Sequence, residues 1–357
     1  MLEKELKGVS VNNAPDKRIA EKVEFEKIRT TDIEGFISFL RDARPDYPYR
    51  WFFDRNWIGQ RISDPFYIWG VLKVNKNIIG TIICYYEPEK KINTLKLLLV
   101  HPQYRKQGIL NTIFFDRLQE RRVIDQIQSS SPNLLYAEVL MNHSTSQNMI
   151  QRMGMIFCGF FPNKTRIEGI PASLTPCALL FKRNSKILNV DKRISNKLEK
   201  ILKYNRIQKI RPLSIGRDEQ EIRKGTQYDY KEEINCELTE NKKYLVKIDA
   251  NNYLKFQFNT YLNCITDTRL YTKNPEIAQF FIEYLLSYNA NYLEALIPPE
   301  LWLQDILICN HFKFTAFIPS FWDGEDVLFF STWKNRPVLT PMMKPIYNII
   351  MEADAFE

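Results

Sequence analysis

The segment Leu97–Leu110, with the sequence Leu-Leu-Leu-Val-His-Pro-Gln-Tyr-Arg-Lys-Gln-Gly-Ile-Leu, combines residue types that suit a phosphate group. An apolar strand ends at Val100, a proline stops its hydrogen-bond ladder, and a basic turn leads into an amphipathic helix. The start of a helix offers unpaired backbone N–H groups and a positive dipole end to an anion. Gly108 allows close backbone approach, and Arg105 and Lys106 add positive charge. The spacing predicts a pyrophosphate-binding turn, with an ordinary basic turn as the alternative.

The elements expected around this turn form a mixed α/β unit. Helical or alternating apolar spacing predicts strands at 23–28, 66–74, 78–86, 92–100, 134–140, 156–161 and 177–182. The same spacing predicts four helices. The first starts at residue 30, the next two span 49–62 and 109–127, and the last spans 144–153 and ends before Gly154. This order indicates an α+β layer on a mostly antiparallel sheet.

A second unit repeats part of that order. We expect strands at 244–248 and 253–258, a helix at 276–287, a strand at 292–297, a helix at 299–309, and strands at 312–318 and 327–333. The string matches the last seven elements of the first unit and predicts an internal structural duplication. The expected organisation is a flexible tail (1–20), a first domain (21–185), a basic linker with a helix (186–240), a second domain (241–335), and a C-terminal tail with a short helix (336–357).

The motif Val-x-Pro-x-Tyr-Arg-x-x-Gly-Ile, at a strand end before an amphipathic helix, resembles the acyl-CoA-binding segment of the GNAT N-acyltransferase superfamily. The stretch from Glu138 to Gln147, followed by Gly154 and Gly159, resembles the family's second signature, in which an Asn precedes a short helix. The two stretches span 23–184, the length of one such domain. The resemblance implies two GNAT-like acyl-CoA N-acyltransferase domains in tandem. The second is expected to be degenerate and without CoA, because it has no glycine between Gly225 and Gly324.

The resemblance implies acetyl-CoA or another acyl-CoA as co-substrate and no metal. In that family a splayed strand end pairs with pantetheine and polarises the thioester carbonyl, and the turn amides hold the pyrophosphate. The corresponding positions here are Leu98, Leu99, Val100, Arg105, Lys106, Gln107, Gly108, Ile109 and Leu110, with Asn142 from the second signature. Leu110 departs from the family's usual Gly or Ala.

The resemblance does not assign the general base, because Thr94 and Ile150 occupy the positions where family members carry a glutamate base and a tyrosine acid. Three residues remain as catalytic candidates. Glu138 could act as the base or be a salt-bridged strand carboxylate. His143 lies near the expected thioester and titrates near neutrality, or simply starts a helix. Tyr136 shares a strand face with Glu138 and could donate a proton, or pack in the core.

Composition excludes several other classes of site. The net charge of +8 comes from residues 1–185, which hold 27 basic and 19 acidic residues against 23 and 23 in the remainder. This bias suits an anionic ligand, whereas the basic segment 186–224 has one aromatic residue and does not favour nucleic-acid binding. Six scattered cysteines predict reduced core thiols, and three dispersed histidines are too few for a metal cluster. The chain has no apolar run for a membrane span and no secretory signal at its start, which predicts a cytoplasmic protein.

The favoured hypothesis is an acyl-CoA-dependent N-acyltransferase acting on the amine of a small-molecule or natural-product acceptor, by direct attack in a ternary complex. The aromatic segment 47–53 is the expected acceptor wall. Three alternatives remain: a non-catalytic CoA-binding sensor or scaffold, favoured by Thr94 and Ile150; aminoacyl transfer from tRNA; and acyl transfer to a carrier-protein thiol. The sequence leaves a homodimer open and gives no sign of a membrane partner.

Overall fold

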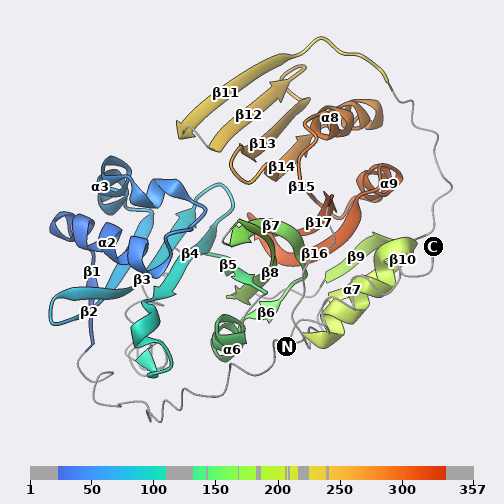
Figure 1. Ribbon diagram of the computed structural model, residues 1–357. Helices are drawn as coiled ribbons and strands as arrows, with labels where there is room; N and C mark the ends of the chain where they lie inside the picture. The colour runs from blue at the N-terminus through green and yellow to red at the C-terminus, as the bar shows by residue number, and fades with distance from the viewer. Residues whose placement is uncertain are drawn as a thin grey trace, which may run out of the picture.

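The computed structural model describes residues 23–109, 132–141, 144–167, 169–181, 186–205, 207, 210–215, 225–238 and 241–334. These residues form two sheet bodies in tandem, with a small βαβ unit between them in the chain (Figure 1). Each sheet is mostly antiparallel and contains one parallel strand pair. The expected fold class, a mixed α/β chain with two sheet domains, is confirmed.

The first body has the strand order β1-β2-β3-β4-β5-β8-β6, with β7 paired to β8. Helix α2 buries Phe36 and Leu40 on one face, as its 3.6-residue spacing predicts. The strands are β1 (Glu24–Lys27), β2 (Tyr67–Val74), β3 (Asn77–Glu87), β4 (Ile92–Val100), β5 (Leu134–Leu140), β6 (Ile156–Phe157), β7 (Phe161–Ile167) and β8 (Ile170–Leu180). The helices are α2 (Ile33–Ala43), α3 (Arg55–Ser63) and α6 (Ser144–Arg152), with 3-10 turns η1 (Thr30–Asp32), η2 (Arg50–Phe53) and η3 (Pro102–Tyr104).

The second body has the order β11-β12-β13-β14-β15-β17-β16, which repeats the first strand for strand. The predicted duplication is therefore present and extends over the whole sheet. Two residues separate β11 from β12, so this body has no counterpart of α2 and α3. Its elements are β11 (Lys231–Leu238), β12 (Asn241–Lys247), β13 (Tyr253–Asn259), β14 (Cys264–Tyr271), α8 (Pro275–Ser287), β15 (Tyr292–Ile297), α9 (Leu301–Cys309), β16 (Lys313–Trp322) and β17 (Glu325–Trp333).

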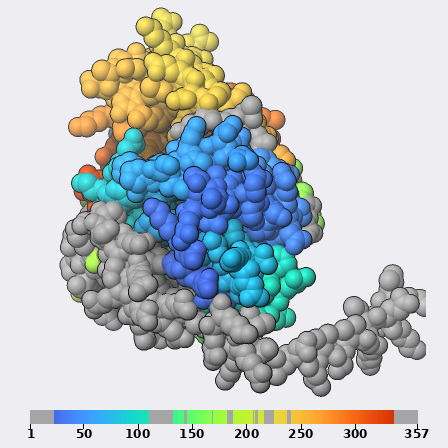
Figure 2. Space-filling model, turned by 90° about the vertical axis from the view of Figure 1, so that its left-hand side faces the viewer, coloured from blue at the N-terminus to red at the C-terminus, as the bar shows by residue number. Residues whose placement is uncertain are grey.

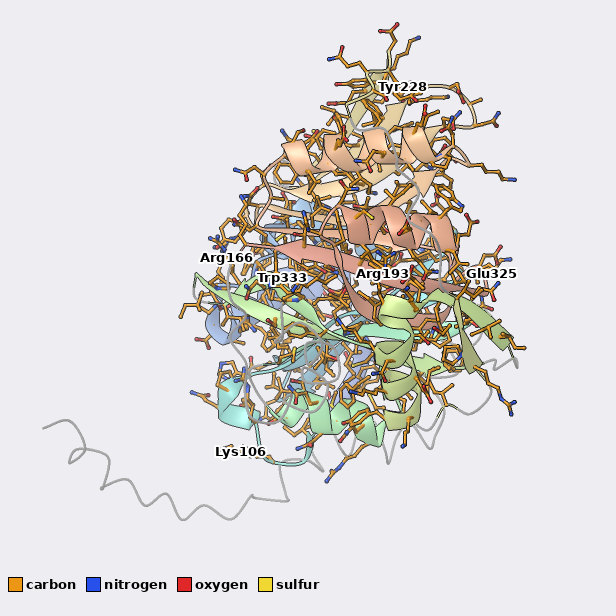
Figure 3. The ribbon with its side chains drawn as sticks, turned by 90° about the vertical axis from the view of Figure 1, so that its right-hand side faces the viewer. Lys106, Arg166, Arg193, Tyr228, Glu325 and Trp333 are labelled. Carbon is orange, nitrogen blue, oxygen red and sulfur yellow. The ribbon has the colours of Figure 1, made fainter. Side chains whose placement is uncertain are left out.

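The segment expected as a basic linker is a packed unit. Strands β9 (Lys186–Asp191) and β10 (Ile210–Ile215) pair in parallel around α7 (Lys192–Tyr204), which contains the helix expected near 194–204. The apolar face of α7 joins the main core. The guanidinium of Arg193, labelled in Figure 3, bonds Asp191 at 2.8 Å and Asp305 of α9 at 2.5 Å. The pair with Asp305 connects the unit to the second body, and the pair with Asp191 lies within the unit.

Besides β9 and β10, three strands differ from the sequence expectation: two contain a buried charged residue, and the third is an exposed edge strand. The expected strand 156–161 is split, and β7 forms a long hairpin with β8 that contains the buried Lys164. Residues 259–273, expected as a turn, contain β14, whose Arg269 is buried. Strand β11 begins ten residues before the domain boundary expected at 241, and its outer residues are exposed on both faces. An edge strand of this kind lacks the alternation that marks a half-buried strand.

Residues 158–160 join the two sheets edge to edge. The Phe160 N–H donates to Thr315 O at 2.9 Å, and the Phe317 N–H donates to Cys158 O at 3.0 Å. Gly159 and Ala316 form the antiparallel bridge between them. The edge that follows β6 in the first sheet thus pairs antiparallel with β16, which lies at the equivalent edge of the second sheet. The two bodies therefore face each other in an approximate two-fold arrangement. Figure 2 shows the second body, yellow to orange, stacked on the blue first body.

We predict that Gly159→Ala destabilises this joint. A Cβ at Gly159 would lie 2.2 Å from Thr315 O and 2.5 Å from Ala316 Cα, and neither backbone atom can yield cheaply. Overpacking of this kind costs about 1–3 kcal/mol, read as a lower denaturant midpoint. The control is Gly59→Ala in α3, whose new Cβ has ordinary contacts and should stabilise by about 0.5–1 kcal/mol. Equal free energies of unfolding for the two variants would contradict the close contact of Gly159 with Thr315 and Ala316.

We also predict that native protein exposes two reactive thiols. Cys236 and Cys309 are exposed, whereas the other four cysteines are buried. Burial raises the pKa of both Cys84 and Cys264 to about 12, which leaves almost no thiolate at neutral pH. Titration with dithiobis-nitrobenzoate should give two fast equivalents, and the remaining four only after unfolding. A third fast thiol that disappears in Cys84→Ser would reopen that residue as a nucleophile.

Candidate functional site

Strands β4 and β5 separate into a fork. They pair in parallel from Ile92↔Leu134 to Leu95↔Ala137, and the register goes no further although both strands continue. A bulge in β4 at Lys96 accompanies the separation, since β3 pairs with Leu95 and then with Leu97. The edge of β4 from 97 to 100 therefore has no β5 partner among the described residues. Its backbone groups can pair with an extended ligand chain, as an added strand does.

The basic turn follows directly on this free edge. Arg105 Nε donates to Val100 O at 2.9 Å, which ties the turn to the strand end. Burial, with a contribution from Arg44, lowers the pKa of the Arg105 guanidinium. Lys106 and Gly108 have φ of 64° and 75°, a left-handed geometry that curves the backbone. A Cβ at Gly108 would meet no atom within 4 Å, so the backbone there borders open space.

The predicted cofactor positions are only partly covered by the structure. Leu98, Leu99 and Val100 lie on the free edge of β4, Arg105 to Gly108 form the turn, and Ile109 is the buried start of the next helix. Figure 3 shows Lys106 at one end of the molecule, with Tyr228 of the second body at the other. Leu110, Asn142 and the catalytic candidate His143 lie outside the described residues.

The other two catalytic candidates lie together at the fork. Glu138 is the first β5 residue beyond the last pair with β4. Its Oε1 accepts a hydrogen bond from the Tyr136 hydroxyl at 2.8 Å and from Lys164 Nζ at 2.7 Å. The Glu138 side chain keeps 24% of its exposure, against 9% for Lys164. Burial, then Glu138, raises the pKa of Tyr136 well above 10, which keeps the phenol protonated.

The second body supplies a matching pair that the sequence reasoning missed. The Tyr292 hydroxyl donates to Glu294 Oε2 at 2.9 Å, and Lys164 Nζ reaches the same oxygen at 2.9 Å. Lys164 thus bridges Glu138 and Glu294. Burial would lower the pKa of Lys164, but the two carboxylates outweigh it and raise the value. The repeated Tyr-x-Glu pattern in two strands expected to be equivalent was the available signal.

The aromatic segment expected as the acceptor wall lies beside this cluster. Tyr47 OH is 3.4 Å from Lys96 O at the bulge. Burial, with a contribution from the charge of Glu138, raises the pKa of Tyr49. The Arg50 guanidinium lies 5.7 Å from the Tyr261 ring of the second body. The second body therefore borders the same side of the fork.

Thr94 and the ionic group beside it occupy the start of the fork. The Thr94 hydroxyl donates to Glu87 Oε1 at 2.5 Å, and Lys90 bonds the other oxygen at 2.8 Å. Burial opposes ionisation of Glu87, yet Lys90 and Lys96 outweigh it and lower its pKa. Lys90 also bonds Asp267 of β14 at 3.1 Å. Glu87 is thus committed to a network that joins the two bodies.

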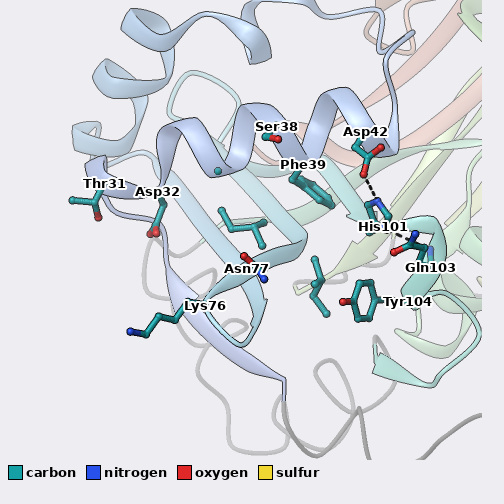
Figure 4. Close-up of a pocket in the computed structure, with 13 residues that line it drawn as sticks. Thr31, Asp32, Ser38, Phe39, Asp42, Lys76, Asn77, His101, Gln103 and Tyr104 are labelled. Carbon is teal, nitrogen blue, oxygen red and sulfur yellow. Dashed lines mark hydrogen bonds and ion pairs between the residues drawn. The ribbon is translucent and has the colours of Figure 1, made fainter.

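A separate pocket of about 400 Å³ lies between α2, the β2–β3 turn and η3 (Figure 4). His101 Nε2 and Asp42 Oδ2 are 2.8 Å apart on its wall. Its lining reaches Tyr104 and stops before Arg105, so it adjoins the basic turn without containing it. Among the described residues no trio of His, Cys, Asp or Glu side chains is placed to hold a metal ion. Within the same residues, no helix has the length and apolar character needed to cross a membrane.

The equivalent fork in the second body is filled by its own residues. The bulge of β14 leaves the Asp267 N–H free of the ladder, and Glu294 Oε1 accepts it at 3.0 Å. The two strands then pair again at Arg269↔Leu296. At the start of α8, the Asn274 side chain accepts from the N–H of Glu276 at 2.8 Å, and Pro275 follows it. The amides that could bind an anion are therefore partly occupied.

Comparisons with known proteins give one family and a set of distant structures. The model of the acetyltransferase (GNAT) family matches residues 36–155. No curated protein gives a significant match. Similar solved structures include ribosomal-protein-S18-alanine N-acetyltransferase from Escherichia coli, at 16% identity over 46% of this chain and 97% of that one, with a TM-score of 0.37. A GNAT-family acetyltransferase from Streptococcus pneumoniae has 16% identity over 45% and 99%, with a TM-score of 0.38.

A third structure is spermidine N-acetyltransferase from Vibrio cholerae in complex with CoA and spermine, at 14% identity over 45% of this chain and 96% of that one, with a TM-score of 0.37. These scores are too low to add to the argument. The matched range of the family model covers the fork, the basic turn and the strand that carries Glu138. Residues 36–155, within the N-terminal sheet body, therefore match the GNAT family of acetyltransferases.

Proposed function

We propose that the chain is an acyl-CoA-dependent N-acyltransferase that transfers an acyl group, with acetyl as the first donor to test, to the amine of a small-molecule acceptor. The observation that carries the proposal is the sequence of features along β4: a free strand edge leads directly into a basic turn whose Gly108 borders open space. An extended pantetheine arm needs the first feature, and a pyrophosphate needs the second.

The binding roles follow from these positions. The backbone of 98–100 would pair with the pantetheine amides, and the N–H groups from Arg105 to Leu110 would face the pyrophosphate. Asn142, after β5, would complete the far side. The positive charges of Arg105 and Lys106 favour the same anion. The fork would then hold the thioester beside Glu138.

The reaction needs one bond formed and one broken. The neutral amine nitrogen attacks the thioester carbonyl carbon, a C–N bond forms, and the C–S bond breaks with its electron pair on sulfur. Glu138 takes a proton from the amine, and the thiolate receives a proton from Tyr136 or solvent. Glu138 suits the base because both of its contacts engage Oε1, and Oε2 has no partner among the described residues. His143 remains the alternative base.

The acceptor would enter between the aromatic segment at 47–53 and the second body. Arg50 and Tyr261 border that side from the two bodies. In the second body the equivalent fork is closed by Glu294 and the helix start is capped by Asn274, which supports a single acyl-CoA site per chain.

A non-catalytic acyl-CoA sensor is the second candidate, and one observation favours it: Glu138 is ion-paired with Lys164. Such a protein would bind acetyl-CoA in the same fork and release no thiol from it with any amine. Binding and turnover therefore need separate measurements.

We predict that Gly108→Ala weakens acetyl-CoA binding at least 10-fold in calorimetric titration of the full chain. The added methyl group would occupy the space that a phosphate approaches. Gly169→Ala is the matched control, because Gly169 has φ of 76° and open space around its Cβ, in the β7–β8 turn. Both changes carry the same left-handed backbone strain. Equal affinities in the two variants would show that the turn is misassigned.

We predict that Glu138→Gln lowers the turnover number about 100-fold and leaves acetyl-CoA affinity within 2-fold. The amide keeps the shape of the side chain and cannot accept the proton. Thiol release from acetyl-CoA would be followed with three probe amines: spermidine, a peptide with N-terminal alanine, and phenethylamine. Glu233→Gln on the exposed edge strand β11 is the control. A wild-type rate in Glu138→Gln would transfer the role of base to His143.

A further inference from the structure

We infer that Lys164 and Glu294 are positioning residues for the base Glu138, so that the second body contributes a carboxylate to the acyl-transfer site of the first. The inference rests on the proposed function, because it assigns what holds and tunes Glu138 in that reaction. It assigns a role to the second body beyond packing, through a side chain 3% exposed in the joint between the two sheets.

The two Tyr-x-Glu pairs are structurally equivalent, as the strand registers show. Tyr136 pairs with Thr94 of β4, and Tyr292 pairs with Cys264 of β14. In each body the regular parallel pairing ends one residue later, at Ala137 or Leu293. Glu138 and Glu294 are therefore the first residues beyond the fork in their respective sheets. The two-fold arrangement of the bodies brings these two positions to the same lysine.

The two carboxylates differ in how completely they are bonded. Glu294 accepts from the Asp267 N–H on Oε1, and from the Tyr292 hydroxyl and Lys164 on Oε2. These three donors hold the carboxylate in one orientation, while burial, opposed by the charge of Lys164, raises the pKa of Glu294. Glu138 receives its two donors on Oε1, and its side chain is 24% exposed. The Glu294 carboxylate of the second body thus has hydrogen-bond partners on both oxygens. The Glu138 carboxylate of the first body has partners among the described residues on Oε1 alone.

Lys164 is the physical link between them. Its 2.9 Å contact with Glu294 fixes the ammonium in place, and its 2.7 Å contact with Glu138 Oε1 fixes the orientation of the base. The ammonium also lies 4.3 Å from the Phe161 ring centroid, which limits its movement. Without Glu294, the full charge of Lys164 would act on Glu138 and make it a weaker base.

The charge balance at Glu138 therefore depends on groups from several elements. Tyr136 on β5 and Lys164 on β7 bond it directly, and its charge also acts on Tyr292 and Glu294 on β15, Tyr49 beside η2 and Cys177 on β8, whereas Cys264 on β14 feels Lys164 and Glu294. The tyrosines and cysteines are held neutral by burial, since each has a raised pKa. The variable charges are those of Lys164 and the two glutamates. Removing a charge beside Glu138 should therefore move the acidic limb of the pH–rate profile in a direction set by the charge removed.

The test is the pH–rate profile of thiol release from acetyl-CoA by the full chain, with spermidine, the alanine peptide and phenethylamine as probes and with water as acceptor. Glu294→Gln removes a negative charge and should move the acidic limb of the turnover number to lower pH, with a plateau at least 10-fold lower. Lys164→Met removes a positive charge and should move the limb to higher pH. Lys164→Met/Glu294→Gln should return the limb close to wild type. Acetyl-CoA affinity by calorimetry should stay within 2-fold in all three.

The possible results distinguish the proposed function from the positioning role of Lys164 and Glu294. Wild-type chain that binds no acetyl-CoA and releases no thiol would reject the proposed function. If the wild-type chain is active and the acidic limb of the Glu294→Gln profile lies at the wild-type pH, the positioning role is rejected and the proposed function stands. If Lys164→Met does not fold, Lys164→Gln removes the same positive charge and keeps a hydrogen-bond donor beside the two carboxylates, and its limb should also move to higher pH. A loss of rate without any shift would indicate a merely structural role and overturn the inference.

Discussion

The edge-to-edge joint of the two sheets is the constraint on which the rest of the structure depends. Three residues at 158–160 leave the first sheet to pair with 315–317 of the second, and Gly159 is the point of closest approach. Once the edges are joined, the inward faces of both sheets are buried against each other. Glu138 and Glu294 project from those faces, and buried carboxylates require a positive partner. Lys164 meets that requirement for both, so the ion cluster follows from the joint.

A β-bulge at the fork has different consequences in the two bodies. A bulge in β4 at Lys96 and a bulge in β14 at Asp267 both break the register with the next strand. In the second body Glu294 bonds the freed amide, and pairing resumes at Arg269. In the first body the strands stay apart, and Glu138 bonds Lys164 instead of the β4 backbone. Among the described residues, the parallel pairing of the fork strands therefore resumes in the second body and does not resume in the first.

Sequence patterns predicted the parts of this fold that obey simple periodicity. Strands at 92–100, 134–140 and 292–297 match because apolar residues predominate in them, although each contains a charged residue. The hairpin β7–β8 and strand β14 were not predicted because Lys164 and Arg269 are charged and yet buried. A one-dimensional pattern scores such residues as exposed. The candidates Glu138 and Tyr136 were identified from their strand, but Lys164 meets Glu138 through the folding of the first body and Glu294 meets Lys164 across the joint, and no local window contains these contacts.

The apolar surface between the bodies explains why a second body without an open fork is retained. Its partner surface on the first body includes Ile92, Leu134, Phe161 and Leu174, all buried within one shared core. Tyr136 packs edge-on against Phe321, 5.0 Å away, and Phe161 lies 5.2 Å from Phe329. Separating the two bodies would expose a large apolar patch together with Glu138, Glu294 and Lys164. The first body is therefore not an independent domain with an attached relic. Its inward face, and the side chain proposed as its base, take their final environment from the second body.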